Sequence, residues 1–181
     1  MTERVTSWPM TEDDFEPHTD QLVEANKAYA EHFHDSELQV RPTMHMAVVA
    51  CMDSRMDIFQ ILGLHNGQAH VIRNAGGIIT DDVLRSVYLS QKAMGTREIV
   101  LLHHTNCGLQ NLDEVSLRRE LEETTGVRPA WTFDSFDSPY DDVKQSIRRL
   151  QMSPFILHKD HIRGFVYEVE TGLLHEVTVD G

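Results

Sequence analysis

Cysteine is almost absent from this sequence of 181 residues, which contains only Cys51 and Cys107. The first residues are polar and acidic, and they lack the apolar stretch of an export signal. Two distant cysteines in a chain without such a signal are a poor basis for a disulfide framework, because cytosolic thiols are normally kept reduced. We therefore expect a cytoplasmic protein with two free thiols.

Basic residues and long apolar runs are also scarce. The chain has 16 Lys and Arg against 29 Asp and Glu, which gives a formal net charge of −13. This excess of negative charge opposes binding to nucleic acid or to anionic lipid. No window approaches the roughly 20 apolar residues that a membrane-spanning helix needs. We therefore expect no nucleic-acid partner and no membrane partner, and a small molecule as substrate.

The remaining composition is that of an ordinary globular protein, with 40% hydrophobic and 25% charged residues. Residues 1–18 are polar, acidic and interrupted by Pro9 and Pro17, which predicts an arm outside the core. The length suits one folded unit. The sequence thus predicts an N-terminal arm, residues 1–18, and a single catalytic domain, residues 19–181.

Strand and helix patterns alternate along the chain. Helical spacing and capping residues predict helices that start near Asp20, Thr80 and Ser138. Two segments around Thr171 and Gly172 predict a closing hairpin. Short apolar runs predict buried parallel strands at residues 44–50, 69–72 and 99–102. The predicted fold is therefore a three-layer α/β fold, with a mostly parallel central sheet, an antiparallel edge hairpin and flanking helices.

Polar segments follow each of the three predicted strands: CMDSR, RNAGG and HHTNCG. In parallel α/β sheets, ligands bind outside the carboxyl ends of the strands. These three segments are therefore expected to meet at one edge of the sheet and to form the functional site.

Cys51, His104 and Cys107 are the predicted metal ligands. Two thiolates and one imidazole suit Zn²⁺, and three protein ligands leave the fourth position open, as in catalytic zinc sites. Adjacent His103 and His104 would face opposite sides of a strand, so at most one points to the metal. We choose His104 because of its His-x-x-Cys spacing to Cys107.

Asp53 and Arg55 follow Cys51 and are the predicted catalytic pair. A carboxylate beside the metal can accept a hydrogen from bound water, and an arginine can hold that carboxylate in its ionised form. In the second segment, Asn74, Gly76 and Gly77 are the predicted substrate-binding residues, because glycines let the backbone approach an anion.

The order Cys51-x-Asp53-x-Arg55, then Arg-Asn-Ala-Gly at 73–76, then His104-x-x-Cys107-Gly resembles the β-carbonic anhydrases. The surrounding sequence resembles the short bacterial and archaeal branch of that family. The resemblance implies one zinc ion per chain and a zinc lyase that reversibly hydrates carbon dioxide to bicarbonate by attack of metal-bound hydroxide. It also implies a homodimer or homotetramer. In some members the aspartate at the position of Asp53 ligates zinc in a resting form, and the sequence leaves that alternative open.

Other functions fit the sequence less well. Hydrolysis of carbonyl sulfide or carbon disulfide on the same scaffold is the main alternative, because the same hydroxide can attack those linear molecules. A non-enzymatic zinc-binding module would usually have a fourth protein ligand, and only Asp53 is available. A phosphatase loop needs arginine six positions after its cysteine, where this chain has Asp57. A redox Cys-x-x-Cys pair is absent.

Overall fold

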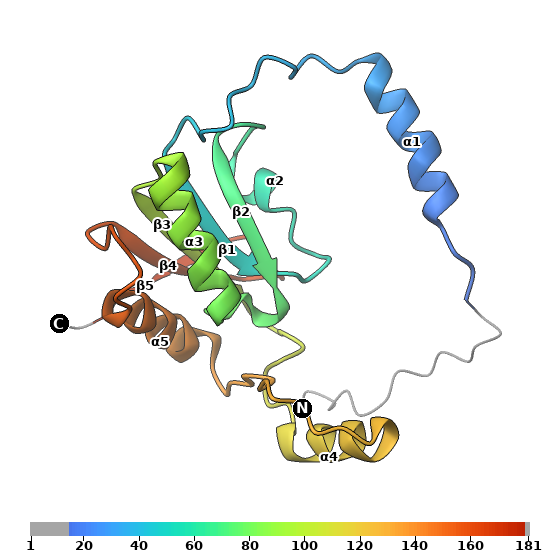
Figure 1. Cartoon of the computed structure of the whole chain (residues 1–181), viewed down its shortest axis with the longest axis vertical. Coiled ribbons are helices and arrows are strands. Elements are labelled where there is room, and N and C mark those ends of the chain that lie inside the picture. Colours follow the sequence, from blue (N-terminus) through green and yellow to red (C-terminus); the bar gives the residue numbers. More distant parts are fainter. Residues whose placement is uncertain (1–14, 180–181) are drawn as a thin grey trace. The chain divides into compact units, whose positions relative to one another are not determined.

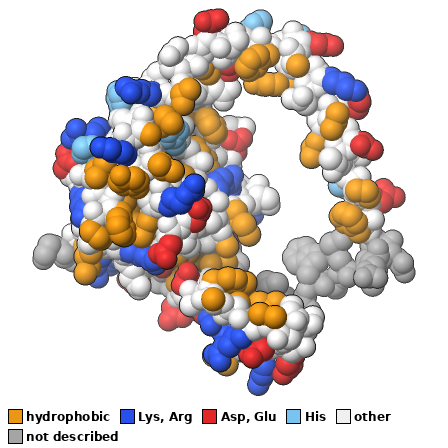
Figure 2. All heavy atoms as spheres, in the orientation of Figure 1, with side chains coloured by type: hydrophobic (Ala, Val, Ile, Leu, Met, Phe, Trp, Pro, Cys, Tyr) orange, Lys and Arg blue, Asp and Glu red, His pale blue; other side chains and the backbone are white. Residues whose placement is uncertain are grey.

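The computed structural model describes residues 15–179 and divides into two compact units, residues 1–39 and 40–181. Most of the predicted arm, residues 1–18, lies outside the described residues. In the first unit, helix α1 (Thr19–Glu31) confirms the helix predicted near Asp20. None of its residues is buried, and its hydrophobic side chains lie at its surface (Figure 2). Among residues 15–179, no helix is long and apolar enough to span a bilayer.

A five-stranded sheet forms the centre of the second unit, in the order β2-β1-β3-β4-β5 (Figure 1). The first four strands in this order pair in parallel, and β5 pairs antiparallel with β4. This confirms the predicted mostly parallel sheet with an antiparallel edge. The strands are β1 (Met46–Cys51), β2 (Ala69–Asn74), β3 (Glu98–His104), β4 (Ile162–Tyr167) and β5 (Leu174–Val177).

Helices cover both faces of the sheet, because the central strands alternate buried apolar side chains between two hydrophobic cores. On one face, Leu101 of β3 packs with α3 (Asp81–Met94) and α5 (Pro139–Met152). On the other face, Leu102 packs with α2 (Ile58–Leu62) and its flanking residues. The two cores give the three layers that the sequence predicts.

Local capping explains where the two long helices begin. The Thr80 side chain accepts a hydrogen bond from Val83 N, and the Ser138 side chain accepts one from Asp141 N. Both are the expected N-caps. Helix α3 ends at Gly95, whose φ of 76° is readily adopted by glycine.

Three short or polar elements are missing from the sequence prediction: α2, the 3₁₀ turn η2 (Ala75–Gly77) and α4 (Glu114–Thr125). Helix α4 is mostly charged and polar, so its few apolar residues do not form a clear helical repeat. Its caps are nevertheless present in the sequence, because Asp113 accepts from Ser116 N and Gly126 adopts the left-handed conformation. These caps are the signal that could have revealed α4.

Helix α5 lies so close to the sheet that only glycine fits at position 164 of β4. A Cβ atom on Gly164 would lie 2.2 Å from Val143 Cγ1 and 3.0 Å from Ile147 Cδ1. We expect Gly164→Ala to lower the free energy of unfolding by about 2 kcal/mol, because α5 must shift. Denaturant titration measures this change. The control Gly108→Ala, where a Cβ meets nothing within 4 Å, should change stability by less than about 0.5 kcal/mol; equal effects would contradict the packing argument.

Candidate metal centre

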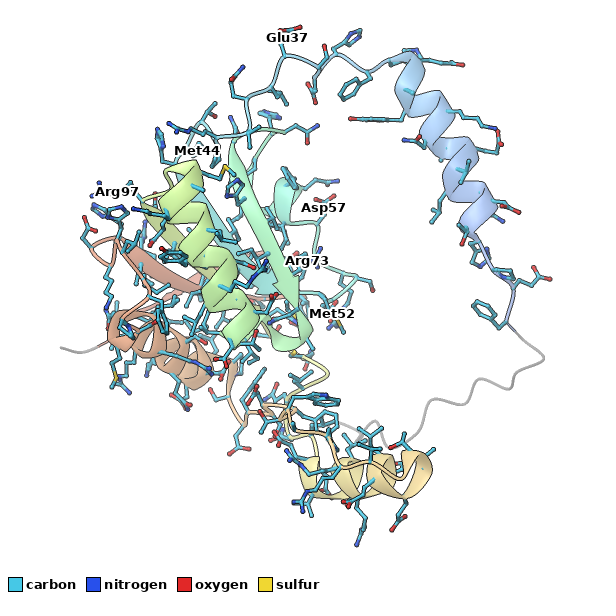
Figure 3. The ribbon with its side chains drawn as sticks, viewed as in Figure 1. Glu37, Met44, Met52, Asp57, Arg73 and Arg97 are labelled. Carbon is cyan, nitrogen blue, oxygen red and sulfur yellow. The ribbon has the colours of Figure 1, made fainter. Side chains whose placement is uncertain are left out.

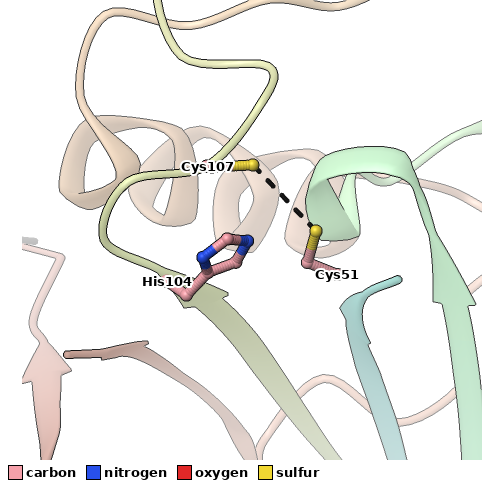
Figure 4. Close-up of side chains that lie close together, drawn as sticks. All are labelled: Cys51, His104 and Cys107. Atoms are coloured by element: carbon pink, nitrogen blue, oxygen red, sulfur yellow. Dashed lines mark hydrogen bonds between the residues drawn. The ribbon is translucent and has the colours of Figure 1, made fainter. Parts of the chain in front are cut away.

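Two adjacent strands bring the three predicted metal ligands together. Cys51 ends β1, His104 ends β3, and the two strands pair in parallel, so both residues lie at the carboxyl edge of the sheet. Cys107 lies three residues beyond His104. Figure 4 shows these three side chains side by side, and their ligand atoms all lie within 4.8 Å of one another. The sequence-predicted set therefore forms one Cys-His-Cys site.

The spacing of the two sulfur atoms suits a single tetrahedral ion. Cys51 Sγ and Cys107 Sγ are 4.0 Å apart (Figure 4). Two Zn–S bonds of about 2.3 Å at a tetrahedral angle place their sulfurs about 3.8 Å apart. The thiols are also free, so no disulfide competes with metal binding.

The His104 ring presents a lone pair to the site. Its Nδ1–H donates to the Thr105 carbonyl oxygen at 2.8 Å, which leaves Nε2 as the unprotonated nitrogen. Nε2 is buried and has no hydrogen-bond partner. An unpartnered buried nitrogen beside two thiols is the arrangement that a bound cation would satisfy. The residues present therefore fit a zinc ion.

The two thiols do not ionise equally without a cation. The Cys107 thiol donates a hydrogen bond to Cys51 Sγ, and this bond lowers the pKa of Cys51. The same bond, together with burial, raises the pKa of Cys107. A second thiolate beside the first is unfavourable unless positive charge lies between them. The pair therefore favours a divalent metal over an empty site.

Asp53 and Arg55 form a bidentate ion pair at the edge of this site. Arg55 Nε donates to Asp53 Oδ1 at 2.8 Å, and Arg55 Nη2 donates to Asp53 Oδ2 at 2.7 Å. These bonds lower the pKa of Asp53 to about 2. Asp53 Oδ2 is 3.6 Å from His104 Nε2, so the carboxylate faces the position of a metal ion. The structure thus brings the predicted catalytic pair to the predicted ligands.

Two arginines hold the backbone around the ligands. Arg55 Nη2 also donates to the Asn106 carbonyl oxygen at 2.9 Å, between His104 and Cys107. Arg73, labelled on β2 in Figure 3, donates to the carbonyl oxygens of Cys51 at 2.9 Å and Asp53 at 2.8 Å. Arg73 belongs to the sequence motif, but the motif alone assigns it no role. In the structure, its two hydrogen bonds hold the backbone of the segment that carries Cys51 and Asp53.

Glu170, in the turn between β4 and β5, is a further contact that sequence reasoning missed. Its carboxylate accepts hydrogen bonds from Thr105 Oγ1 at 3.1 Å and from Asn106 Nδ2. Thr105 Oγ1 also accepts from Val169 N at 3.1 Å. These bonds anchor the loop between His104 and Cys107 to the hairpin. No local pattern reveals them, because they join segments far apart in the sequence.

The predicted substrate-binding residues lie beside Cys51. Asn74 pairs with Cys51 in the sheet register and donates its side-chain N–H to the Ile78 carbonyl at 2.8 Å. Its Oδ1 is buried without a hydrogen-bond partner. Gly76 and Gly77 have φ angles of 77° and 72°, so the turn requires glycine at both positions.

Other histidines lie away from the metal site. Four histidines outside the ligand set, His65, His103, His158 and His161, are considered as proton shuttles. His65, His158 and His161 precede the amino ends of β2 and β4. That edge is about 20 Å from the carboxyl edge, given about 3.3 Å per residue. His103 is fully buried, and burial lowers its pKa to about 4. The geometry therefore favours none of the four as a shuttle.

Known proteins resemble this chain in sequence and in fold. The family model described as carbonic anhydrase matches residues 46–132. The chain is 46% identical over 160 residues to β-carbonic anhydrase 1 of Mycobacterium tuberculosis, covering 88% of this chain and 98% of that protein. The crystal structure of carbonic anhydrase from Streptococcus mutans superposes with a TM-score of 0.84 at 38% identity, over 91% of this chain and 99% of that one.

A second group of relatives has a different activity. A carbon disulfide hydrolase of Acidithiobacillus thiooxidans is 37% identical over 149 residues, covering 70% of this chain and 74% of that protein. It is less similar than the mycobacterial relative in both identity and coverage. Together with the sheet and the Cys-His-Cys site, these similarities establish that the chain belongs to the β-carbonic anhydrase family.

Proposed function

We propose that this protein catalyses the reversible hydration of carbon dioxide to bicarbonate, with one zinc ion held by Cys51, His104 and Cys107. The observation that carries the proposal is the Cys-His-Cys site with the Asp53 carboxylate directed at it. The 46% identity to a β-carbonic anhydrase over most of both chains supports the reaction. When bound, zinc lowers the pKa of a coordinated water and so supplies a nucleophile at neutral pH.

The protein's own groups then orient the reaction. With its pKa near 2, Asp53 is too weak a base to keep a proton from water at neutral pH. It acts instead as a hydrogen-bond acceptor at Oδ2, and it would orient a water or hydroxide held at the site. Arg55 keeps this carboxylate charged and in place through two hydrogen bonds. Asn74, Gly76 and Gly77 are proposed to surround carbon dioxide and bicarbonate.

Several broader features are part of the same proposal. We propose a cytoplasmic enzyme that forms a homodimer or homotetramer, with residues 1–18 as an arm and 19–181 as the catalytic domain. Two β-carbonic anhydrases of Sordaria macrospora are tetrameric, and one of their structures resembles this chain at 18% identity. Sedimentation measurements would distinguish the dimer from the tetramer.

One preparation of the protein tests the reaction. We would measure zinc per chain and follow carbon dioxide hydration by stopped flow at pH 7 and pH 8.5. About one zinc ion per chain and a faster rate at the higher pH are expected, because the nucleophile forms by loss of a proton. Full zinc occupancy without hydration at either pH would contradict the proposal.

The carbon disulfide hydrolase relatives support a second candidate, hydrolysis of carbonyl sulfide or carbon disulfide at the same site. Release of hydrogen sulfide from each compound, measured on the same zinc-loaded protein, decides between them. A kcat/KM for carbon dioxide that exceeds the values for both sulfur compounds would support the anhydrase. The reverse order would favour the hydrolase.

A further inference from the structure

A buried acid and histidine pair lies behind the metal site and has no part in the proposed reaction. His103 precedes His104 on β3, so its side chain lies on the opposite face of the sheet, where α5 packs. His103 Nδ1 is 3.2 Å from Asp142 Oδ2 in the first turn of α5. Neither atom makes a hydrogen bond in the structure, not even to the other, and the Asp142 side chain is only 14% exposed.

A hydrogen held between these two atoms would satisfy both of them. His103 Nε2 is 3.2 Å from the Gly77 carbonyl oxygen, so Nε2 carries a hydrogen and donates it. If Nδ1 and the carboxylate both lacked a hydrogen, two acceptors would face each other in the protein interior, which is strongly unfavourable. Burial raises the pKa of Asp142 to about 6, so this carboxyl keeps its hydrogen up to a higher pH than an exposed aspartate does. With a hydrogen held between Asp142 and His103, the two residues and Gly77 are linked in one continuous chain of contacts.

Gly77 connects this chain to the backbone of the metal site. A Cβ atom at Gly77 would lie 2.9 Å from Cys51 N and 3.1 Å from the carbonyl carbon of Ala50. The Gly77 Cα thus lies directly against the peptide that joins Ala50 to Cys51. His103 holds the Gly77 carbonyl oxygen through its hydrogen bond. A change in that bond would therefore shift Gly77 against the Ala50–Cys51 peptide.

We infer that Asp142 is a positioning residue for the metal site, because it fixes Gly77 through His103 and thereby supports the backbone that presents Cys51. The inference rests on the proposed metal site. Asp142 itself touches neither the metal ligands nor the substrate position. Loss of such outer partners typically weakens metal binding 10- to 100-fold in other proteins.

The neighbouring Asp141 provides a matched control. Both residues are aspartates in the first turn of α5, near the positive end of the helix dipole. Asp141 is 69% exposed and pairs only loosely with Lys144, at 3.6 Å. We expect Asp142→Ala to release zinc to a chromogenic chelator about tenfold faster than wild type. Asp141→Ala should stay within about twofold, because it removes charge without touching His103.

Asp142→Asn removes the acidic group but keeps a side chain that can hydrogen-bond to His103. In Asp142→Asn, the amide N–H can donate to His103 Nδ1, so zinc release should return to within about twofold of wild type. The nitrogen-15 signal of His103 Nδ1 should stay near its wild-type position in Asp142→Asn and move in Asp142→Ala. Equal release from the two alanine variants would overturn the inference, as would an asparagine variant as fast as Asp142→Ala.

The test still decides if Asp142→Ala fails to fold, or if the wild-type protein binds zinc but does not hydrate carbon dioxide. If Asp142→Ala does not fold, the asparagine variant decides alone: unchanged release and an unchanged His103 signal support the inference, and tenfold faster release overturns it. Zinc release does not depend on turnover. A wild-type protein that holds zinc without hydrating carbon dioxide therefore contradicts the proposed reaction, while the comparison of Asp142 with Asp141 still tests the positioning role.

Discussion

Replacement of Cys107 by alanine is expected to abolish zinc binding and, with it, carbon dioxide hydration. Cys107 Sγ is one of three ligand atoms that lie within 4.8 Å of one another. Its removal leaves two protein ligands, too few for a stable catalytic zinc site. Loss of a mere outer partner costs 10- to 100-fold in metal affinity, so loss of a ligand should cost more than about 100-fold. Zinc per chain, measured after gel filtration, should fall close to zero.

Two controls separate loss of metal from loss of the fold. Met52 directly follows Cys51 in the sequence, but its side chain is 63% exposed and does not belong to the ligand set. Met52→Ala should therefore retain full zinc. Circular dichroism of Cys107→Ala should match that of wild-type protein stripped with a chelator. If Cys107→Ala kept both full zinc and the full rate, the assigned metal site would be wrong. Cys51→Ala and His104→Ala are expected to behave as Cys107→Ala does.

The carboxyl-edge rule explains why the sequence could predict so much of this site. Cys51 and His104 each follow a short apolar run, and such runs form adjacent parallel strands. Once both strands are recognised, their last residues must lie at one edge of the sheet. Strand alternation also separates His104 from His103, and the structure places the two rings among different partners.

Contacts between distant elements could not be predicted in this way. Asp142 lies on α5 and Glu170 in the last hairpin, and each reaches the β3 edge through tertiary packing. Their local sequence explains only that Asp142 suits a helix start. Helix α4 escaped prediction because its sequence, EVSLRRELEETT, is mostly charged and polar. Its few apolar residues are too sparse to show a helical repeat, whereas α1 carries enough apolar residues at helical spacing to be predicted although none of them is buried.

Replacement of Asp53 by asparagine is expected to lower kcat by at least about 100-fold while zinc stays bound, because loss of one preorganised hydrogen-bonding group in an active site typically costs about that much. The amide keeps the shape of the side chain, but it loses the charge that Arg55 holds and offers N–H donors in place of an acceptor. Stopped-flow rates on protein of measured zinc content provide the test. Asp82→Asn, which breaks an exposed Asp–Arg contact of 3.5 Å on α3, is the matched control and should retain the full rate.

The pH profile of Asp53→Asn adds an independent criterion. Because Arg55 lowers the pKa of Asp53 to about 2, the wild-type carboxylate is already ionised throughout the range from pH 6 to pH 9. A rise in the hydration rate between pH 6 and pH 9 must therefore come from the titration of a group other than Asp53. Asp53→Asn should lower the maximum rate far more than it shifts the pH at which the rate is half-maximal. Full activity in the variant would contradict the orienting role. Loss of zinc would instead identify Asp53 as a fourth ligand, since the amide is a poorer ligand than the carboxylate whose Oδ2 lies 3.6 Å from His104 Nε2.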